Sequence, residues 1–193
     1  MRKFLRRVLT LVAVVAAAIG LAGTPANADA GWNVSPEGSY AAISTDSRLI
    51  NGSGMLQCAM VIASGHVASS TDSQVGTVTD NAWSNCSATF GFVFSVQPAG
   101  TWTIHALGIN SSGWVDVEIR SVNATISSPL CYATVTGSVR GTYDNAGTLR
   151  LYEPPGGNLV ISSASCLGRL NPGDRPGYSA TFTVSPDLTI TPA

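Results

Sequence analysis

The stretch Cys131–Tyr152, CYATVTGSVRGTYDNAGTLRLY, joins two extended arms through the polar segment Asp-Asn-Ala-Gly at 144–147. Asn and Gly tolerate positive φ, and an Asp side chain accepts hydrogen bonds from a turn backbone, so this segment predicts a hairpin turn. In the second arm Leu149 and Leu151 alternate with Arg150, which predicts leucines facing a core and an arginine facing solvent. The stretch is therefore interpreted as scaffold rather than as a functional site.

The same alternation recurs along the chain after residue 28. The segments TWTIHAL (101–107), WVDVEIR (114–120) and YSATFTV (178–184) each alternate apolar with polar residues, as strands with one buried and one solvated face do. Turn segments rich in Gly, Pro and Asn separate them at intervals of about ten residues. These signals predict an all-β fold, an antiparallel β-sandwich or a barrel-like domain, with roughly ten to twelve strands.

The first 28 residues have the pattern of a secretory signal peptide. A basic head that includes Arg6 and Arg7 precedes a largely apolar run at 8–23, and Ala26-Asn27-Ala28 supplies a small-residue cleavage site. The apolar run falls short of the ~20 residues that span a bilayer. We therefore expect a secreted, extracellular protein with no membrane span. Residues 29–193 are expected to form a single domain, with two duplicated halves that meet near 127–129 as the alternative.

The charge distribution argues against a polyanionic partner. Four of the ten Lys and Arg residues lie within 1–28, and all eleven Asp and Glu residues lie beyond them, which leaves a formal charge of about −5 after cleavage. Binding to nucleic acid or to an anionic membrane requires a basic surface. We expect a monomer that binds neither.

The four cysteines are expected to form disulfides. An even count in an exported chain favours disulfides, and sequential pairing, Cys58–Cys86 and Cys131–Cys166, closes the shorter loops. Structural zinc sites use close pairs such as Cys-x-x-Cys, and this chain has none. No metal and no cofactor are predicted.

The residues that could carry catalysis are sparse. The two histidines, His66 and His105, are expected at a turn and on an exposed strand face, and the nucleophile-elbow pattern Gly-x-Ser-x-Gly is absent. Asp116 and Glu118 point the same way along one strand and form the best available acid pair for a glycoside hydrolase. Their simplest interpretation is a solvated strand face with a local ion pair to Arg120. The protein is therefore predicted not to be an enzyme.

Two tryptophans in polar settings are the candidate ligand-binding residues. Trp114 shares a predicted strand face with Asp116, Glu118 and Arg120, where an indole ring can stack on a sugar and the polar groups can bond its hydroxyls. Trp83 lies in TDNAWSNC beside a predicted disulfide, which suits either a glycan-binding loop or packing against that disulfide.

Several segments together resemble a known class of proteins. TVTDNAWSNC (77–86), the opening stretch with its continuation NLVISSASCLG (158–168), and YSATFTVSPDLTIT (178–191) are similar to segments of uncharacterised small secreted all-β proteins of high-GC actinobacteria. The resemblance covers most of the chain after residue 28. It implies compartment and fold and no activity, because the segments carry no catalytic motif.

The sequence thus favours an exported, non-enzymatic binding module. The expected partner is a cell-wall or environmental glycan or a surface protein. The alternatives are a structural or matrix protein, a secreted glycoside hydrolase, and a small-molecule carrier, which would require an apolar pocket.

Overall fold

The computed structural model describes residues 31–52, 54–89 and 91–193, so the predicted signal peptide lies outside the described residues. Within these ranges the chain forms strands and no helix. No described segment is a helix with the length and apolarity to cross a membrane. The strands are β1 (Trp32–Ser35), β2 (Gly38–Ser44), β3 (Ser47–Asn51), β4 (Gly54–Val67), β5 (Gln74–Ala88), β6 (Val93–Pro98), β7 (Trp102–Ile109), β8 (Val115–Ser128), β9 (Cys131–Tyr143), β10 (Thr148–Glu153), β11 (Val160–Ser165), β12 (Gly177–Ser185) and β13 (Thr189–Pro192).

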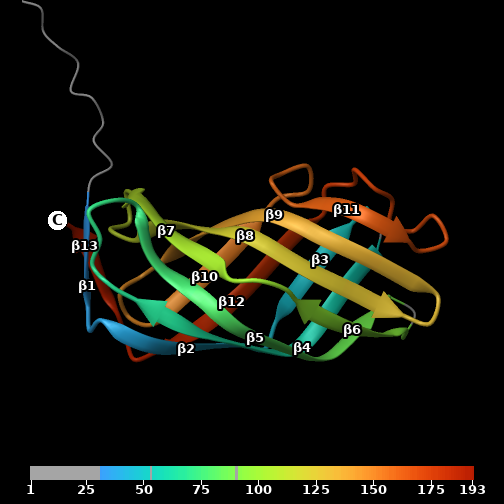
Figure 1. The fold of residues 1–193 in the computed structure, drawn as a ribbon, viewed down its shortest axis with the longest axis horizontal. Helices are drawn as coiled ribbons and strands as arrows, with labels where there is room; N and C mark the ends of the chain where they lie inside the picture. Colours follow the sequence, from blue (N-terminus) through green and yellow to red (C-terminus); the bar gives the residue numbers. More distant parts are fainter. Residues whose placement is uncertain (1–30, 53, 90) are drawn as a thin grey trace, which may run out of the picture.

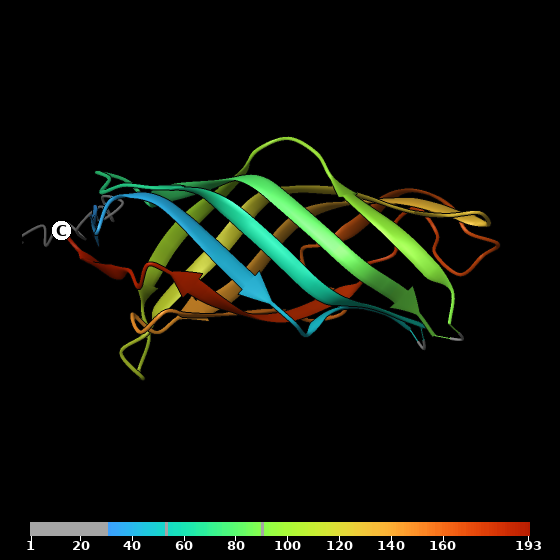
Figure 2. The same ribbon diagram turned by 90° about the horizontal axis from the view of Figure 1, so that it is seen from below.

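Eight strands close into a barrel (Figures 1 and 2). The antiparallel circuit runs β8–β9–β10–β12–β2–β4–β5–β7 and returns to β8. The predicted all-β antiparallel class is confirmed, and the closed circuit makes it a barrel rather than a sandwich of two sheets. The strand count exceeds the predicted range partly because β2 and β3 both pair with β4 and are separated by a short bend.

The opening stretch forms the predicted hairpin. Leu149 pairs with Tyr143 across β9 and β10, and the turn is closed by a hydrogen bond from Asp144 N to Thr148 O. Asp144 Oδ1 accepts hydrogen bonds from the backbone N–H groups of Ala146 and Thr148. Gly147 has φ of +83°, a conformation that favours glycine. The predicted turn chemistry is confirmed.

β9 changes partners along its length, and a glycine permits the change. Its second half pairs with β10 and its first half with β11. Between them Gly137 has φ of +131°, and a Cβ there would lie 2.1 Å from the carbonyl oxygen of Asn158. The backbone conformation disfavours a side chain at this position, and the loop between β10 and β11, which contains Asn158, lies too close to admit one.

The two ends of the barrel differ. One end is covered by the two-stranded sheet of β1 and β13 (Figure 1), whose Trp32, Val34 and Ile190 are buried. At the same end Tyr143 Oη donates to Leu188 O and accepts from Leu188 N. The other end carries β3, β6 and β11, the β8–β9 turn and the loop at 166–176 (Figure 1). We call this second end the mouth.

Both predicted disulfides are present near the mouth. Cys58 and Cys86 are paired neighbours on β4 and β5, and their disulfide links the two strands directly. Cys131, at the start of β9, is bonded to Cys166, which follows β11. The second disulfide therefore ties the β8–β9 turn to the loop that leads into β12.

Candidate functional site

The predicted ligand-binding residues fall into two places. Trp114 directly precedes β8, and Asp116, Glu118 and Arg120 follow on its outer face, in alternation with buried core residues. Trp83 lies on β5 and lines the barrel interior. The structure therefore places four of the five residues along one segment, where Glu118 and Arg120 contact each other, and separates Trp83 from them.

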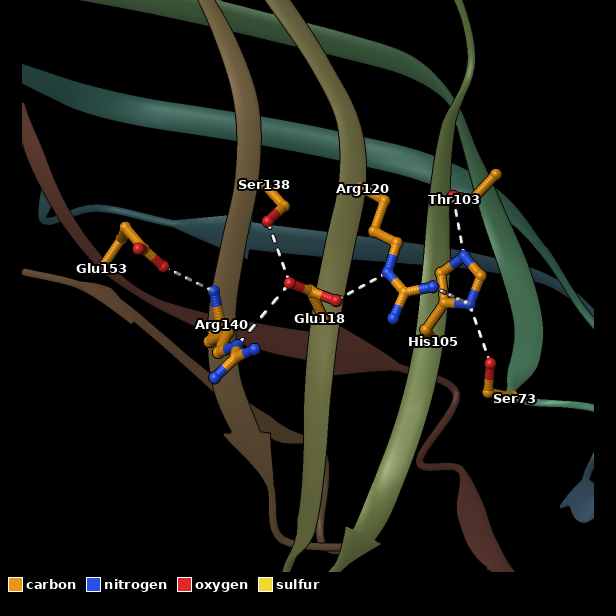
Figure 3. A network of polar contacts seen from close by, with 8 residues as sticks. All are labelled: Ser73, Thr103, His105, Glu118, Arg120, Ser138, Arg140 and Glu153. Atoms are coloured by element: carbon orange, nitrogen blue, oxygen red, sulfur yellow. Dashed lines mark hydrogen bonds and ion pairs between the residues drawn. The ribbon is translucent and has the colours of Figure 1, made fainter. Parts of the chain in front are cut away.

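Glu118 is the centre of a polar network across β7, β8 and β9 (Figure 3). Its Oε2 accepts a hydrogen bond from Arg120 Nε at 2.6 Å, and its Oε1 accepts one from Ser138 Oγ at 2.9 Å. Arg140 Nε lies 3.6 Å from Oε1. The Glu118 side chain is 9% exposed, so the predicted ion pair exists but its carboxylate is covered rather than solvated.

The electrostatics of this network do not suit acid catalysis. Burial raises the pKa of Glu118, but hydrogen bonds from Arg120 and Ser138 and the charges of Arg120 and Arg140 outweigh it, so the pKa is lowered. The general acid of a glycosidase requires a raised pKa. Asp116, the other carboxylate of the predicted pair, accepts a hydrogen bond from Asn110 at 2.9 Å. Each of the two carboxylates is therefore held by hydrogen bonds from neighbouring side chains.

His105 belongs to the same network, and its prediction as an exposed histidine is wrong because it is buried. Arg120 Nη1 lies 3.3 Å from its Nδ1 and Ser73 Oγ lies 3.1 Å from the same atom. Since Arg120 can only donate, Nδ1 accepts, and Nε2 carries the proton and donates to Thr103 Oγ1 at 3.0 Å. Burial, followed by the charge of Arg120, lowers the pKa of His105.

The Ser73–His105 contact differs from that of a catalytic triad in its third member. A triad orients its histidine with a carboxylate on the second ring nitrogen, whereas here that nitrogen contacts a threonine hydroxyl. Neither residue lines the two pockets described below. His66 also differs from its prediction, because it lies within β4, paired with Thr77, and not at a turn.

Trp114 contacts a neighbouring arginine. The guanidinium carbon of Arg150 lies 4.8 Å from the ring centroid, and its Nη1 donates to Asp144 Oδ2 at 3.1 Å. Burial raises the pKa of Asp144, but hydrogen bonds from the turn backbone and from Arg150 outweigh it and bring the pKa to about 2. One face of the Trp114 ring is thus taken by a cation–π contact.

Trp83 faces the inside of the barrel. Its Nε1 donates to Asn81 Oδ1, and its ring centroid lies 6.1 Å from that of Tyr178. Both partners line the same interior cavity. Trp83 is therefore positioned to contact a molecule held within the barrel rather than one on its outer surface.

The interior cavity has a volume of about 140 Å³ and an apolar character. Tyr40, Tyr143 and Tyr178 project into it, and each hydroxyl already has a partner, in Thr77 O, Leu188 O and Ser47 Oγ respectively. In the part of the chain that the structure describes, no buried side-chain nitrogen or oxygen lacks a hydrogen bond. The interior cavity therefore offers a ligand apolar contacts rather than free hydrogen-bonding groups.

A larger pocket of about 320 Å³ opens at the mouth. We call it the mouth pocket. Leu49, Leu56 and Ile126 line both this pocket and the interior cavity, so the two spaces adjoin. The mouth pocket is lined by Leu49, Asn51, Gly54, Met55, Leu56, Ala88, Thr89, Phe92, Phe94, Ile126, Ser128, Leu130, Cys131, Cys166, Leu167, Arg169 and Leu170.

Exposed apolar side chains surround the mouth pocket. Met55, Phe92, Leu130 and Leu167 line it and come from the β3–β4 hairpin, the β5–β6 turn, the β8–β9 turn and the loop after β11. Their residues are 38%, 56%, 63% and 81% exposed. We call these four residues the apolar rim. Large apolar groups at or beside four separate turns are expensive to leave in water, and here they converge on one pocket.

Sequence reasoning missed the mouth pocket. Its lining comes from short stretches around Leu56, Thr89, Leu130 and Leu170, which come together only when the barrel closes. The available signal was a set of large apolar residues, such as Phe92 and Leu167, at positions where turns normally place polar ones. The alternating pattern of residues 114–120 favoured Trp114 as a binding residue instead.

Comparisons with protein-family models, with curated proteins and with solved structures find no match to this chain. Within residues 31–52, 54–89 and 91–193 no group of three or more His, Cys, Asp and Glu side chains is placed to hold a metal ion. The functional proposal therefore rests on the geometry of the two pockets.

Proposed function

We propose that this protein is an exported binding protein that holds an apolar small molecule in the mouth pocket of its barrel. The observation that carries the proposal is the open, apolar mouth pocket, which adjoins an apolar interior and is surrounded by the apolar rim. The signal-peptide pattern of residues 1–28 and two disulfides, which are typical of extracellular proteins, support the export.

The physical basis is burial of apolar surface on both sides. Ligand sites are concave and mostly apolar, with few polar groups to orient the ligand. Each methylene that moves from water into such a site gains about 0.8 kcal/mol. The rim residues Phe92, Leu130 and Leu167 gain in the same way when a ligand covers them. Binding thus removes the exposed apolar surface that is otherwise unexplained.

The geometry favours this ligand class over the predicted glycan. A glycan platform needs an open aromatic face and free polar groups, whereas Trp83 faces inward and Arg150 covers one face of Trp114. The glycan hypothesis stays a prediction that retention on insoluble cell wall, compared between the wild type and Trp114→Ala, would test. A purely structural role differs from both in having no saturable ligand.

The test is a fluorescence titration with N-phenyl-1-naphthylamine, an uncharged apolar probe. The wild type is expected to enhance its emission saturably with one site per chain. Leu56→Trp places a bulky ring where the mouth pocket meets the interior cavity and is expected to weaken binding at least tenfold. The matched control is Leu107→Trp, because Leu107 is exposed on β7 and lines neither pocket.

The titration also has outcomes that reject the proposal. Absence of saturable binding by the wild type contradicts it, as does equal loss in Leu56→Trp and Leu107→Trp. Leu170→Trp obstructs the same pocket from a loop outside the strands, and it replaces Leu56→Trp if that variant fails to fold.

A further inference from the structure

We infer that the ligand is a single-chain amphiphile with an anionic head group, whose head pairs with Arg169 while its alkyl chain enters the mouth pocket. This inference rests on the proposed function and names its ligand class. Among the residues that line the mouth pocket in the structure, Arg169 is the one with a charged side chain. It adjoins Leu167 and Leu170 of the same lining.

The backbone of Arg169 is held in place at the mouth. Its N–H donates to Cys166 O at 2.9 Å, and its carbonyl accepts a hydrogen bond from Asn51 Nδ2 at 3.4 Å. Cys166 is fixed in turn by its disulfide to Cys131. The arginine therefore projects from an anchored position between the end of β3 and the Cys131–Cys166 disulfide.

The guanidinium group, in contrast, is left without a partner. It is exposed and makes no ion pair or hydrogen bond with any residue that the structure describes. The nearby carboxylate of Asp174 is already used, since its Oδ2 accepts from Asn51 Nδ2 and from Asn171 N, both at 2.9 Å. Hydrogen bonds from Asn171 and Asn51 accordingly lower the pKa of Asp174.

Most of the other arginines beyond residue 28 have partners. Arg120 and Arg140 pair with Glu118, Arg150 pairs with Asp144, and Arg175 donates to Gly157 O. Each of these contacts lies away from the mouth pocket lining. Arg169 therefore differs from them in combining an anchored backbone, an unpaired guanidinium group and an adjacent apolar pocket.

This combination matches the two halves of an anionic amphiphile. The polar atoms of the interior are already hydrogen-bonded, so a polar head group would lose its hydration there without compensation. At the mouth, Arg169 can donate two parallel hydrogen bonds to a carboxylate, a strong contact whose planar geometry matches the guanidinium group. The head is thus expected at the rim and the chain toward Leu56 and Ile126.

Arg48 supplies a matched control within the same chain. It is exposed on β3, next to Leu49, which lines the pockets, and so faces the opposite side of the strand. It likewise makes no ion pair with a residue of the described ranges. Arg48→Gln and Arg169→Gln remove the same charge, and they differ in whether that charge borders the mouth pocket.

The experiment measures displacement of N-phenyl-1-naphthylamine by dodecanoate and by dodecanol, both below their aggregation concentrations. We expect the wild type to bind dodecanoate more tightly than dodecanol. Arg169→Gln is expected to weaken dodecanoate binding roughly tenfold, the scale of a hydrogen-bonded charged contact, and to leave dodecanol binding unchanged. Arg48→Gln is expected to change neither, and added salt is expected to weaken the dodecanoate preference.

The outcomes separate the inference from the proposed function. If the probe and dodecanol bind but Arg169→Gln leaves dodecanoate unaffected, or Arg48→Gln weakens it equally, the anionic ligand class is wrong and the apolar site stands. If neither the probe nor dodecanol binds, the proposed function itself fails. Co-sedimentation with phosphatidylglycerol vesicles that depends on Arg169, without binding of monomeric dodecanoate, would assign the arginine to a lipid surface and overturn the inference.

Discussion

At the scale of single residues, this protein uses charge in two opposite ways. Glu118 is covered by the side chains that neutralise it, and its partners Arg120 and Arg140 come from its own strand and the adjacent strand β9. Arg169 is anchored through its backbone, and its guanidinium group is free. The first arrangement holds the outer face of the barrel together, and the second leaves a cation available to a ligand.

Replacement of Glu118 tests the structural use of charge. Glu118→Gln removes the ion pairs while it keeps the shape of the side chain, and it leaves Arg120 and Arg140 without their carboxylate partner. We expect the free energy of unfolding to fall by about 1–3 kcal/mol, the cost of disrupting a covered charged hydrogen-bond network. Urea denaturation measures it, with Asp116→Asn as the control on the same strand face, where a loss below about 1 kcal/mol is expected.

The pH dependence of stability gives a second readout of Glu118. Its folded pKa lies below the ordinary value of 4.5, so the unfolded chain binds protons more readily as the solution is acidified. The stabilisation is therefore fully present above pH 4.5 and is lost as the pH falls through the lowered folded pKa. We expect the wild type to lose more stability than Glu118→Gln over this interval. Parallel curves for the two proteins would show that Glu118 contributes nothing.

At the scale of elements, the turn tips carry the functional interpretation. The strands place apolar side chains inside the barrel, and the tips at the mouth place Phe92, Leu130 and Leu167 around an opening. The Cys131–Cys166 disulfide joins two of these tips. It is therefore expected to maintain the shape of the mouth pocket as well as the stability of the fold.

Removal of each disulfide tests this difference. In the chain-entropy account, separations of 28 and 35 residues predict comparable losses of about 3–4 kcal/mol. Cys131 and Cys166 line the mouth pocket, whereas Cys58 and Cys86 do not. We expect Cys131→Ser/Cys166→Ser to weaken probe binding and Cys58→Ser/Cys86→Ser to leave it nearly unchanged, both measured in the folded state. The reverse order would contradict the role given to the Cys131–Cys166 disulfide.

The sequence predicted elements better than it predicted the site. Alternation and turn chemistry identified the hairpin of β9 and β10 and its inward Leu149 and Leu151, because these depend on neighbours in the chain. The even cysteine count and the preference for shorter loops identified both disulfides. Closure of the barrel and the mouth pocket depend on contacts between distant segments, which no local pattern encodes. The environment of His105 was missed for the same reason, since Ser73 and Arg120 approach it from other segments.

At the scale of the whole molecule, the barrel is covered at one end and open at the other. β1 and β13 cover the first end, and the apolar rim surrounds the second. Between them the interior cavity lies beside Trp83 and Tyr178. A ligand chain that enters at the mouth therefore approaches Trp83 and Trp102, which both line the interior cavity, while Trp114 stays on the outside.

Tryptophan emission reports this path. We expect binding of dodecanol, which is optically silent, to change the emission of the wild type, because Trp83 and Trp102 line the cavity that adjoins the mouth pocket. Trp83→Phe is expected to reduce the change, Trp83→Phe/Trp102→Phe is expected to abolish it, and Trp114→Phe is expected to preserve it. A change that disappears with Trp114→Phe would place the ligand on the outer face.

The most direct test of the account is to locate a bound ligand by intermolecular nuclear Overhauser effects in the complex with dodecanoate. The account predicts contacts from the methylene protons to Leu49, Leu56 and Ile126, which line both pockets. Contacts confined to the outer face around Trp114, with none to these three residues, would contradict the claim that the barrel is a container for an apolar molecule.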